Sequence, residues 1–119
     1  MIEEFLRRHL EWVDIGYEKY HEKFTRYIVY QCRFFSLRLH QIQAPEWQKC
    51  HDHPWSFLTF LIWPGYQERV EDKIYRRWPG MILWRPAKFT HAVYTPYGTS
   101  WSLVLLMKKS NEWSFKECR

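Results

Sequence analysis

Residues 51–65, which read HDHPWSFLTFLIWPG, decide the fold more clearly than any other stretch of this 119-residue chain. The middle of the stretch is rich in aromatic and β-branched side chains, which suit the half-buried surface of a β-sheet. The tripeptide Trp63-Pro64-Gly65 predicts a turn, because proline presets φ and glycine permits a positive φ. The sequence therefore predicts a strand over Cys50–Ile62 that ends in a turn.

The same combination of strand and turn continues on both sides of this stretch. The tripeptide occurs again at residues 78–80, and residues 95–98 (TPYG) are a third turn sequence. Between the turns, apolar and polar residues alternate as they do along a strand with one buried face. Short strands with regular turns predict a mainly β chain, folded as an antiparallel sandwich or barrel. The further predicted strands are Tyr27–Phe34, Phe35–Ile42, Tyr66–Tyr75, Met81–Arg85, His91–Tyr94 and Trp101–Met107.

The N-terminal segment has a helical pattern instead. Apolar residues recur at helical spacing up to Asp14, and two glutamates lie in the first turn, where the helix dipole favours negative charge. We expect a short helix that reaches Asp14, with helical character extending over residues 17–24. The length of the chain suits one domain. We therefore expect a single domain, with residues 1–24 as a helical segment and residues 25–119 as a β-barrel.

Charge and cysteine content narrow the functional classes. The net charge is +5, but basic residues are scattered among acidic ones, so a nucleic-acid partner is not favoured. No apolar run approaches the ~20 residues that a transmembrane helix needs, and the first residues lack the apolar region of a secretory signal. The three cysteines form neither an even set nor a C-x-x-C pair, which predicts unpaired thiols. We expect a cytoplasmic protein that does not enter a membrane.

Three of the six histidines form a pattern that suits a metal ion. His51 and His53 make an H-x-H, so both side chains project from the same face of a strand. His91 belongs to a separate predicted strand. Imidazole is a normal ligand for Fe(II), Zn, Cu, Mn and Ni, and three protein ligands leave positions open for water or substrate. Histidines that hydrogen-bond to one another in a core would have the same spacing, so the pattern by itself leaves both interpretations open.

The residues before and after His91 resemble the second sequence motif of the cupin superfamily, G-x5-P-x-G-x2-H-x3-N. Gly80, Pro86 and His91 fall at the intervals of this motif. Lys88 replaces its second glycine, and Thr95 replaces its asparagine.

The first cupin motif, G-x5-H-x-H-x3-4-E-x6-G, resembles the segment around the H-x-H. The two histidines and the closing Gly65 match, whereas Pro45 stands in place of the opening glycine. The metal-binding glutamate of the motif is missing, because the two spacer lengths place that position at Phe57 or Leu58. The resemblance to the two motifs covers roughly residues 45–95.

The resemblance implies a double-stranded β-helix, or jelly roll, with a metal inside its barrel. The segments HDHPWSF (residues 51–57) and SWSLVLLMKKSNEWSF (residues 100–115) also look like small phage and bacterial cupin-like proteins that are similar to cysteine dioxygenase. With His51, His53 and His91 as ligands and no acid, the implied site is similar to the three-histidine Fe(II) sites of cupin thiol dioxygenases. Zn, Mn and Ni are alternatives, because imidazole binds them as well.

Two carboxylates are candidates to support the metal. Glu68 and Glu71 lie on the strand predicted to return from the turn at residues 63–65. If that turn is a hairpin, counting the register places Glu71 opposite Leu58, so either glutamate is a candidate fourth ligand or base. Their alternation with basic residues also fits solvated charges on an exposed strand.

Further residues are candidates to bind a substrate. Arg38 and His40 share one face of their predicted strand, and arginine binds carboxylates bidentately. Arg85 is a further candidate to bind a carboxylate, and Tyr94 and Trp101 are candidates to line a pocket. Surface positions for the charged residues and core positions for the aromatic ones are the alternatives.

We predict a metal-binding cupin that acts as an Fe(II)/O2-dependent oxygenase on a small polar molecule such as a thiol. No catalytic residue is assigned. One alternative is a non-catalytic binding protein of cupin fold, including a phage-type interaction module, and another is a non-redox metal cupin such as an isomerase. Nucleotide enzymes are not favoured, because four isolated glycines cannot build a phosphate loop or a dinucleotide fingerprint. Whether the chain forms a homodimer is left open.

Overall fold

The computed structural model describes residues 2–14, 23–53 and 55–109. Within these residues one helix, α1 (Ile2–His9), precedes nine strands, so the prediction of a mainly β chain with a short N-terminal helix is confirmed. No helix in these ranges is long and apolar enough to span a membrane. The strands are β1 (Glu11–Asp14), β2 (Lys23–Gln31), β3 (Ser36–Gln43), β4 (Trp55–Trp63), β5 (Tyr66–Val70), β6 (Lys73–Arg77), β7 (Ile82–Arg85), β8 (Ala92–Tyr94) and β9 (Ser100–Lys109).

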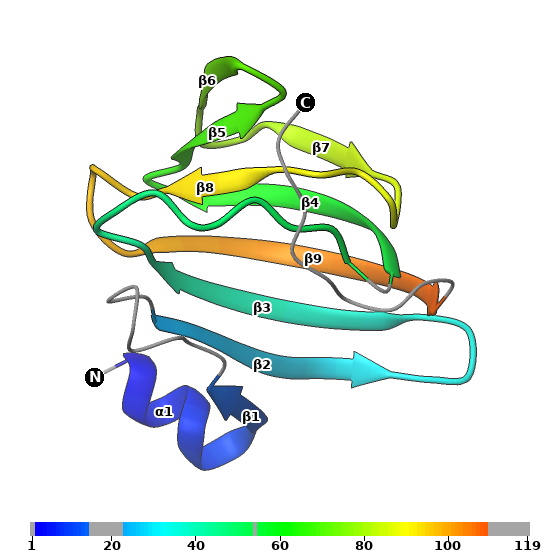
Figure 1. Ribbon diagram of the computed structural model, residues 1–119. Helices are drawn as coiled ribbons and strands as arrows, with labels where there is room; N and C mark the ends of the chain where they lie inside the picture. Colours follow the sequence, from blue (N-terminus) through cyan, green and yellow to red (C-terminus); the bar gives the residue numbers. More distant parts are fainter. Residues whose placement is uncertain (1, 15–22, 54, 110–119) are drawn as a thin grey trace.

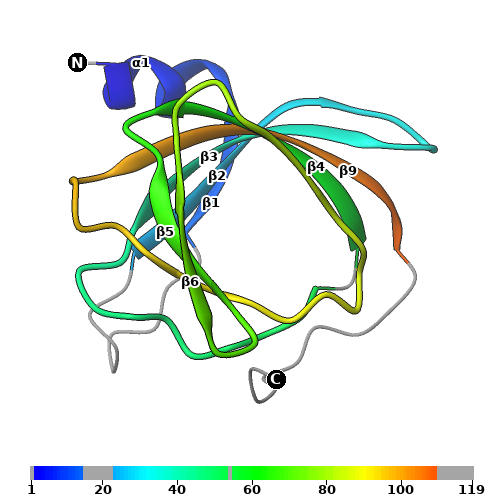
Figure 2. The same cartoon turned by 90° about the horizontal axis from the view of Figure 1, so that it is seen from above.

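The strands form two antiparallel sheets that face each other (Figure 1). The larger sheet has six strands in the order β1-β2-β3-β9-β4-β7, and the smaller sheet has three in the order β6-β5-β8. Figure 2 shows the two sheets curving around a common centre, with α1 outside them. The consecutive strands β4 and β5 belong to different sheets, so the chain crosses between the sheets at the turn that joins them.

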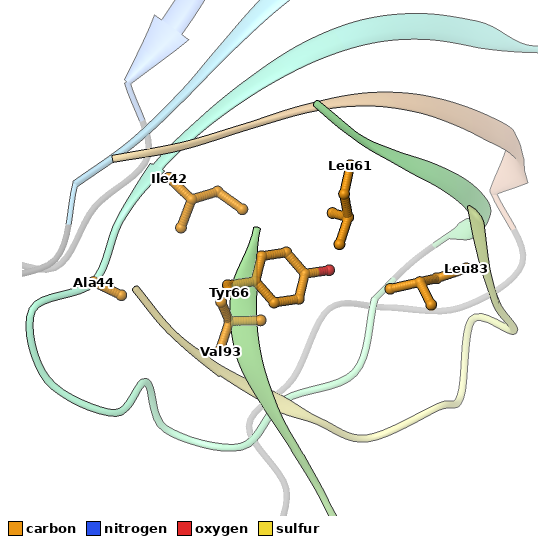
Figure 3. Close-up of a cluster of buried hydrophobic side chains, with 6 residues drawn as sticks. All are labelled: Ile42, Ala44, Leu61, Tyr66, Leu83 and Val93. Atoms are coloured by element: carbon orange, nitrogen blue, oxygen red, sulfur yellow. The ribbon is translucent and has the colours of Figure 1, made fainter. Parts of the chain in front are cut away.

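Apolar side chains from both sheets meet between them (Figure 3). Side chains alternate between the two faces of a strand, so the buried residues identify the face that points inward. The main core cluster consists of Ile42, Ala44, Leu61, Tyr66, Leu83 and Val93. A second cluster, from the larger sheet, consists of Phe57, Val104 and Leu106 with Trp55 packed against it.

The crossing between the sheets depends on Gly65. Its φ is 86°, a conformation that glycine adopts without a steric penalty. A Cβ atom at this position would lie only 2.2 Å from the carbonyl oxygen of Arg77, so the space also excludes a side chain. The predicted turn is therefore present, but it connects two sheets rather than the two strands of a hairpin.

The helix is shorter than predicted. It ends at His9 instead of Asp14, and residues 11–14 form β1, which pairs with β2. Asp14 accepts a 2.6 Å hydrogen bond from the hydroxyl of Thr25 on that strand. Pairing with a neighbouring strand therefore outweighs the helical spacing of the apolar residues. Most of the predicted helical extension lies outside the described residues, and its last two residues begin β2.

The strand predicted over Cys50–Ile62 begins only at Trp55. The preceding segment turns toward the smaller sheet, because the backbone of His51 pairs with that of His91 in an isolated β-bridge. The two backbone hydrogen bonds of this bridge measure 2.9 and 3.0 Å. A cross-sheet contact of this kind is not encoded in the local pattern.

The strand predicted over Tyr66–Tyr75 is a hairpin of β5 and β6. Glu71 lies in its turn with a φ of 58°. Since β5 pairs with β6 and β8 and not with β4, Glu71 does not lie opposite Leu58, and that predicted register is wrong.

The cysteines also differ from the prediction. Cys32 is free, but Cys50 is disulfide-bonded, so the expectation of three unpaired thiols is wrong for Cys50. An odd number of cysteines still permits one pair. Cys118 lies outside the described residues.

Candidate metal centre

His51, His53 and His91 come together between the two sheets. The first two precede β4 and the third precedes β8. The backbone bridge between His51 and His91 brings these distant segments side by side. One ring nitrogen from each histidine lies within 4.8 Å of those of the other two, and His51 and His91 are only 8% and 5% exposed. The structure therefore brings together all three predicted ligands in a group that could hold a metal ion.

Hydrogen bonds donated by Nδ1 orient two of the three rings. Nδ1 of His51 donates to the carbonyl oxygen of Lys49 at 2.8 Å. Nδ1 of His91 donates to the carboxylate of Glu68 at 2.6 Å. In a neutral imidazole this leaves Nε2 unprotonated, which is the form that binds a metal.

The spacing of one pair of Nε2 atoms suits a single ion. Nε2 of His53 lies 3.0 Å from Nε2 of His91. With metal–nitrogen bonds of about 2.1 Å, two ligands at right angles around one ion lie about 3 Å apart. The same distance also permits a hydrogen bond between the two rings. The donor set of three imidazoles fits a bound metal, and the geometry of this pair also fits the alternative of a hydrogen-bonded histidine cluster.

The site holds His51 and His53 in the neutral form. Burial, together with the charge of His91, lowers the pKa of His51 to about 4. The same two causes lower the pKa of His53 well below its usual value, and the positive charge of Arg26 adds to the effect. At neutral pH no proton therefore competes for the ligand nitrogens of these two residues.

Glu68 is fully buried and contacts the metal centre through the ring of His91. Besides the bond from His91, it accepts a 2.9 Å hydrogen bond from Nε of Arg77 and further bonds from Nε and Nη2 of Arg85. Burial by itself would raise the pKa of Glu68, but the hydrogen bonds from His91 and Arg85 outweigh it and lower the pKa to about 2. Glu68 is therefore an ionised carboxylate that orients a ligand histidine.

The neighbours of Glu68 correct two interpretations of the sequence. Glu68 is not a solvated strand charge, and the metal-ligating group found among the described residues contains the three histidines without it. Arg85, considered for binding a substrate carboxylate, binds Glu68 from the opposite sheet. Arg77 also binds Glu68, and nothing in the local sequence distinguishes it from Arg76.

Arg38 and His40 lie on the inward face of β3. Arg38 donates from Nε to the hydroxyl of Ser36 at 3.0 Å. His40 pairs with Arg26 of β2, and its Nε2 atom is buried without a hydrogen-bond partner. Burial lowers the pKa of His40 well below its usual value, and the charges of Arg26 and Arg38 lower it further. Both residues therefore face the interior that holds the histidines.

The remaining candidates lie away from the histidines. Glu71 is exposed in its turn. The ring of Tyr94 packs against Trp47 at 5.3 Å between ring centres. The ring of Trp101 stacks on Tyr27 at 6.3 Å, on the outward face of the larger sheet.

Arg26 and Trp55 were not identified from the sequence, although both point inward near the histidines. The segment FTRYI offered one signal. Period-two alternation places Arg26 on the same face as Phe24 and Ile28, and a charge on an otherwise apolar face is unusual for a simple surface strand.

Neither protein-family models nor curated protein sequences match this chain. Solved structures do. A cupin-2 domain protein from Rhodospirillum rubrum is 11% identical, with a TM-score of 0.73 over 91% of this chain and 76% of that chain. The polyketide cyclase RemF from Streptomyces resistomycificus is 15% identical, with a TM-score of 0.73 over 95% and 84% of the two chains. The DMSP lyase DddQ from Ruegeria pomeroyi is 16% identical, with a TM-score of 0.72 over 90% and 61%.

These similarities establish the class to which the architecture belongs. The protein has the cupin fold, and the jelly roll implied by the two motifs is confirmed. Sequence identities this low support a shared fold but not a shared function. Within that fold, the candidate site is a buried group of three histidines backed by an ionised glutamate.

Proposed function

We propose that this protein is a mononuclear metal enzyme that binds a divalent cation through His51, His53 and His91 and acts on a small polar molecule. The observation that carries the proposal is the convergence of three imidazoles, those of His51 and His91 buried and that of His53 half-buried, with two of them oriented by hydrogen bonds that Nδ1 donates. Three protein ligands leave coordination positions open, as catalytic sites require.

We favour Fe(II) as the metal and an oxygenase reaction on a small thiol. Three neutral imidazoles supply no compensating charge, so the ion would keep its positive charge and attract an anionic substrate such as a thiolate. Bound Fe(II) would supply the capacity to react with O2. The residues of the chain would hold the ion, keep His91 aligned through Glu68, and exclude bulk water from the interior.

The same ligands would serve Zn, Mn or Ni in a non-redox enzyme such as an isomerase. An isomerase needs a base, and the sequence put forward Glu68 for that role. This carboxylate is ionised but already accepts bonds from His91, Arg77 and Arg85. Its engagement by these donors favours the oxygenase over a reaction in which Glu68 abstracts a proton.

The test is O2 consumption by protein that has been purified without chelator or affinity-tag nickel and loaded with Fe(II) under anaerobic conditions. The proposal predicts O2 uptake with at least one small thiol in the wild type and in His9→Ala, and none in His91→Ala. Tight Fe(II) binding without O2 uptake would reject the oxygenase and leave a non-redox metal enzyme. Absence of binding for Fe(II), Zn and Mn would reject the metal enzyme in favour of a binding protein.

A further inference from the structure

A second cluster of charge lies on the inward face of the larger sheet, next to the three histidines. Arg26 of β2 pairs with His40 of β3, and Arg38 is two residues from His40 on the same face. The guanidinium carbons of Arg26 and Arg38 lie 5.5 and 5.6 Å from the centre of the Trp55 ring. Trp55 follows His53 by two residues, so the cluster adjoins the candidate metal centre.

Neither arginine has an acidic partner in the described part of the chain. Among the residues that the structure describes, Arg26 and Arg38 form no salt bridge, whereas two other inward arginines, Arg77 and Arg85, both bind Glu68. The Nε atom of Arg26 is buried and has no hydrogen-bond partner. The charge of Glu11 acts on Arg38 only from beyond ion-pair distance.

Such an arrangement is unfavourable for the chain alone. Two like charges repel each other, and burial removes water that would otherwise solvate them. Burial and the charge of Arg38 lower the pKa of Arg26 to about 10, so the residue is still protonated at neutral pH. The Trp55 ring offers both cations a favourable aromatic face, but it cannot neutralise them. Among the described residues, no carboxylate neutralises this pair at ion-pair distance, so a bound anion would complete the site.

We propose that Arg26 and Arg38 bind a dianionic group of the substrate, either a phosphoryl group or a pair of carboxylates, and hold it beside the three histidines. This inference rests on the proposed function, because it names the substrate class of the same site. The guanidinium fork matches the oxygen atoms of both groups. A single carboxylate would leave one of the two cations uncompensated.

Calorimetric titration of the metal-free protein tests the inference directly. Inorganic phosphate, malonate and acetate are compared at equal ionic strength. Phosphate or malonate should bind one molecule per chain, at least about tenfold more tightly than acetate. Binding of phosphate alone identifies a phosphoryl group, binding of malonate alone identifies a dicarboxylate, and binding of both supports the shared dianionic chemistry. Equal affinities for all three anions, or no binding of any, would overturn the inference.

Substitutions locate the binding. Arg26→Gln and Arg38→Gln should each weaken binding of the preferred anion by about tenfold or more, because each removes a charge-assisted hydrogen-bond donor. Arg33→Gln is the matched control, since Arg33 is exposed in the connection between β2 and β3. Unchanged affinity in both inward variants, or an equal loss in Arg33→Gln, would contradict the assignment.

Thermal melting in anion-free buffer separates binding from a structural role. Removal of an uncompensated inward cation should leave the melting temperature of Arg26→Gln equal to or above that of the wild type. A marked decrease would assign Arg26 to the structure and overturn the inference. His91→Ala should lose metal binding and keep anion binding. Wild-type protein that binds the anion but no metal would reject the proposed function alone, and protein that binds metal but no anion would reject this inference alone.

Discussion

Glu68 illustrates how neighbouring residues decide the state of a buried carboxylate. Burial opposes its charge, yet donors from His91, Arg77 and Arg85 keep it ionised and hold it against a ligand histidine. The sequence identified Glu68 as a candidate because it lies on the strand predicted to return from the turn at residues 63–65. Its role was not predictable, because Arg85 reaches it from the other sheet and a strand pattern contains no information about such partners.

Glu68→Gln tests this support. The amide is isosteric but uncharged, so it leaves two inward arginines without a counter-charge. We expect the free energy of unfolding, measured by urea denaturation, to fall by about 3 kcal/mol or more. The affinity for a divalent metal should fall about 10- to 100-fold, because His91 loses its charged acceptor.

Glu71→Gln is the control for this substitution, since Glu71 is exposed in the turn between β5 and β6. It should change the free energy of unfolding by no more than about 0.5 kcal/mol. If the two variants were equally stable, the contribution of Glu68 would be that of an ordinary surface charge.

At the scale of the elements, the local pattern predicted strands far better than their partners. The strands predicted over Phe35–Ile42 and Met81–Arg85 agree with β3 and β7 to within one residue at each end. The alternation of apolar and polar residues and the presence of turn residues are local properties, so they can be recognised in a single sequence. Pairing is not local, and the predicted hairpin at residues 63–65 proved to be a crossing between sheets. For the same reason the sequence did not identify Arg26, since the role of this residue depends on the strand that pairs with its own.

Two glycines with nearly equal φ allow the cost of a positive φ to be distinguished from the cost of a steric clash. Gly65 and Gly80 have φ values of 86° and 88°, but a Cβ would meet the Arg77 carbonyl only at Gly65. Gly80→Ala should cost about 1 kcal/mol of unfolding free energy, the strain of a positive φ. Gly65→Ala should cost clearly more, because the backbone must also move. Equal losses in urea denaturation would show that the crossing tolerates a side chain at Gly65.

At the scale of the whole molecule, the two sheets enclose charged and titratable groups as well as apolar ones. The cupin motifs predicted the three histidines because motif spacing records where strands meet in this fold. They did not predict the inward-facing Arg26 and Arg38, which lie outside both motifs. Some of these enclosed groups are kept neutral and others are kept charged. The stability of the molecule therefore depends on pH.

Metal-free protein should become less stable as the pH falls from about 6.5 toward 4. In the unfolded chain histidine titrates near ~6.5, whereas in the fold the pKa of His51 is about 4 and those of His40 and His53 are also lowered. The unfolded state therefore binds more protons in this window, which lowers the free energy of unfolding, by roughly 3 kcal/mol at most for His51.

The depressed pKa of Glu68 acts in a lower window. Its stabilising contribution is fully present above the ordinary glutamate pKa and is lost only as the pH falls toward about 2. Urea denaturation at pH 7, 5.5 and 4.5 therefore isolates the histidine effect, and His40→Gln should lessen the slope. Stability that is constant or rises toward pH 4.5 would contradict the neutral, buried state of the histidines.

The most direct test of the central claim is calorimetric titration of metal-free protein with Zn(II) and, under anaerobic conditions, with Fe(II). The three-histidine centre predicts one ion per chain for the wild type. His51→Ala, His53→Ala and His91→Ala should each lose this binding, because two ligands remain from a set of three. His9→Ala should bind as the wild type does, since His9 lies on α1. Equal binding by all four variants, or no binding by the wild type, would contradict a metal centre at these histidines.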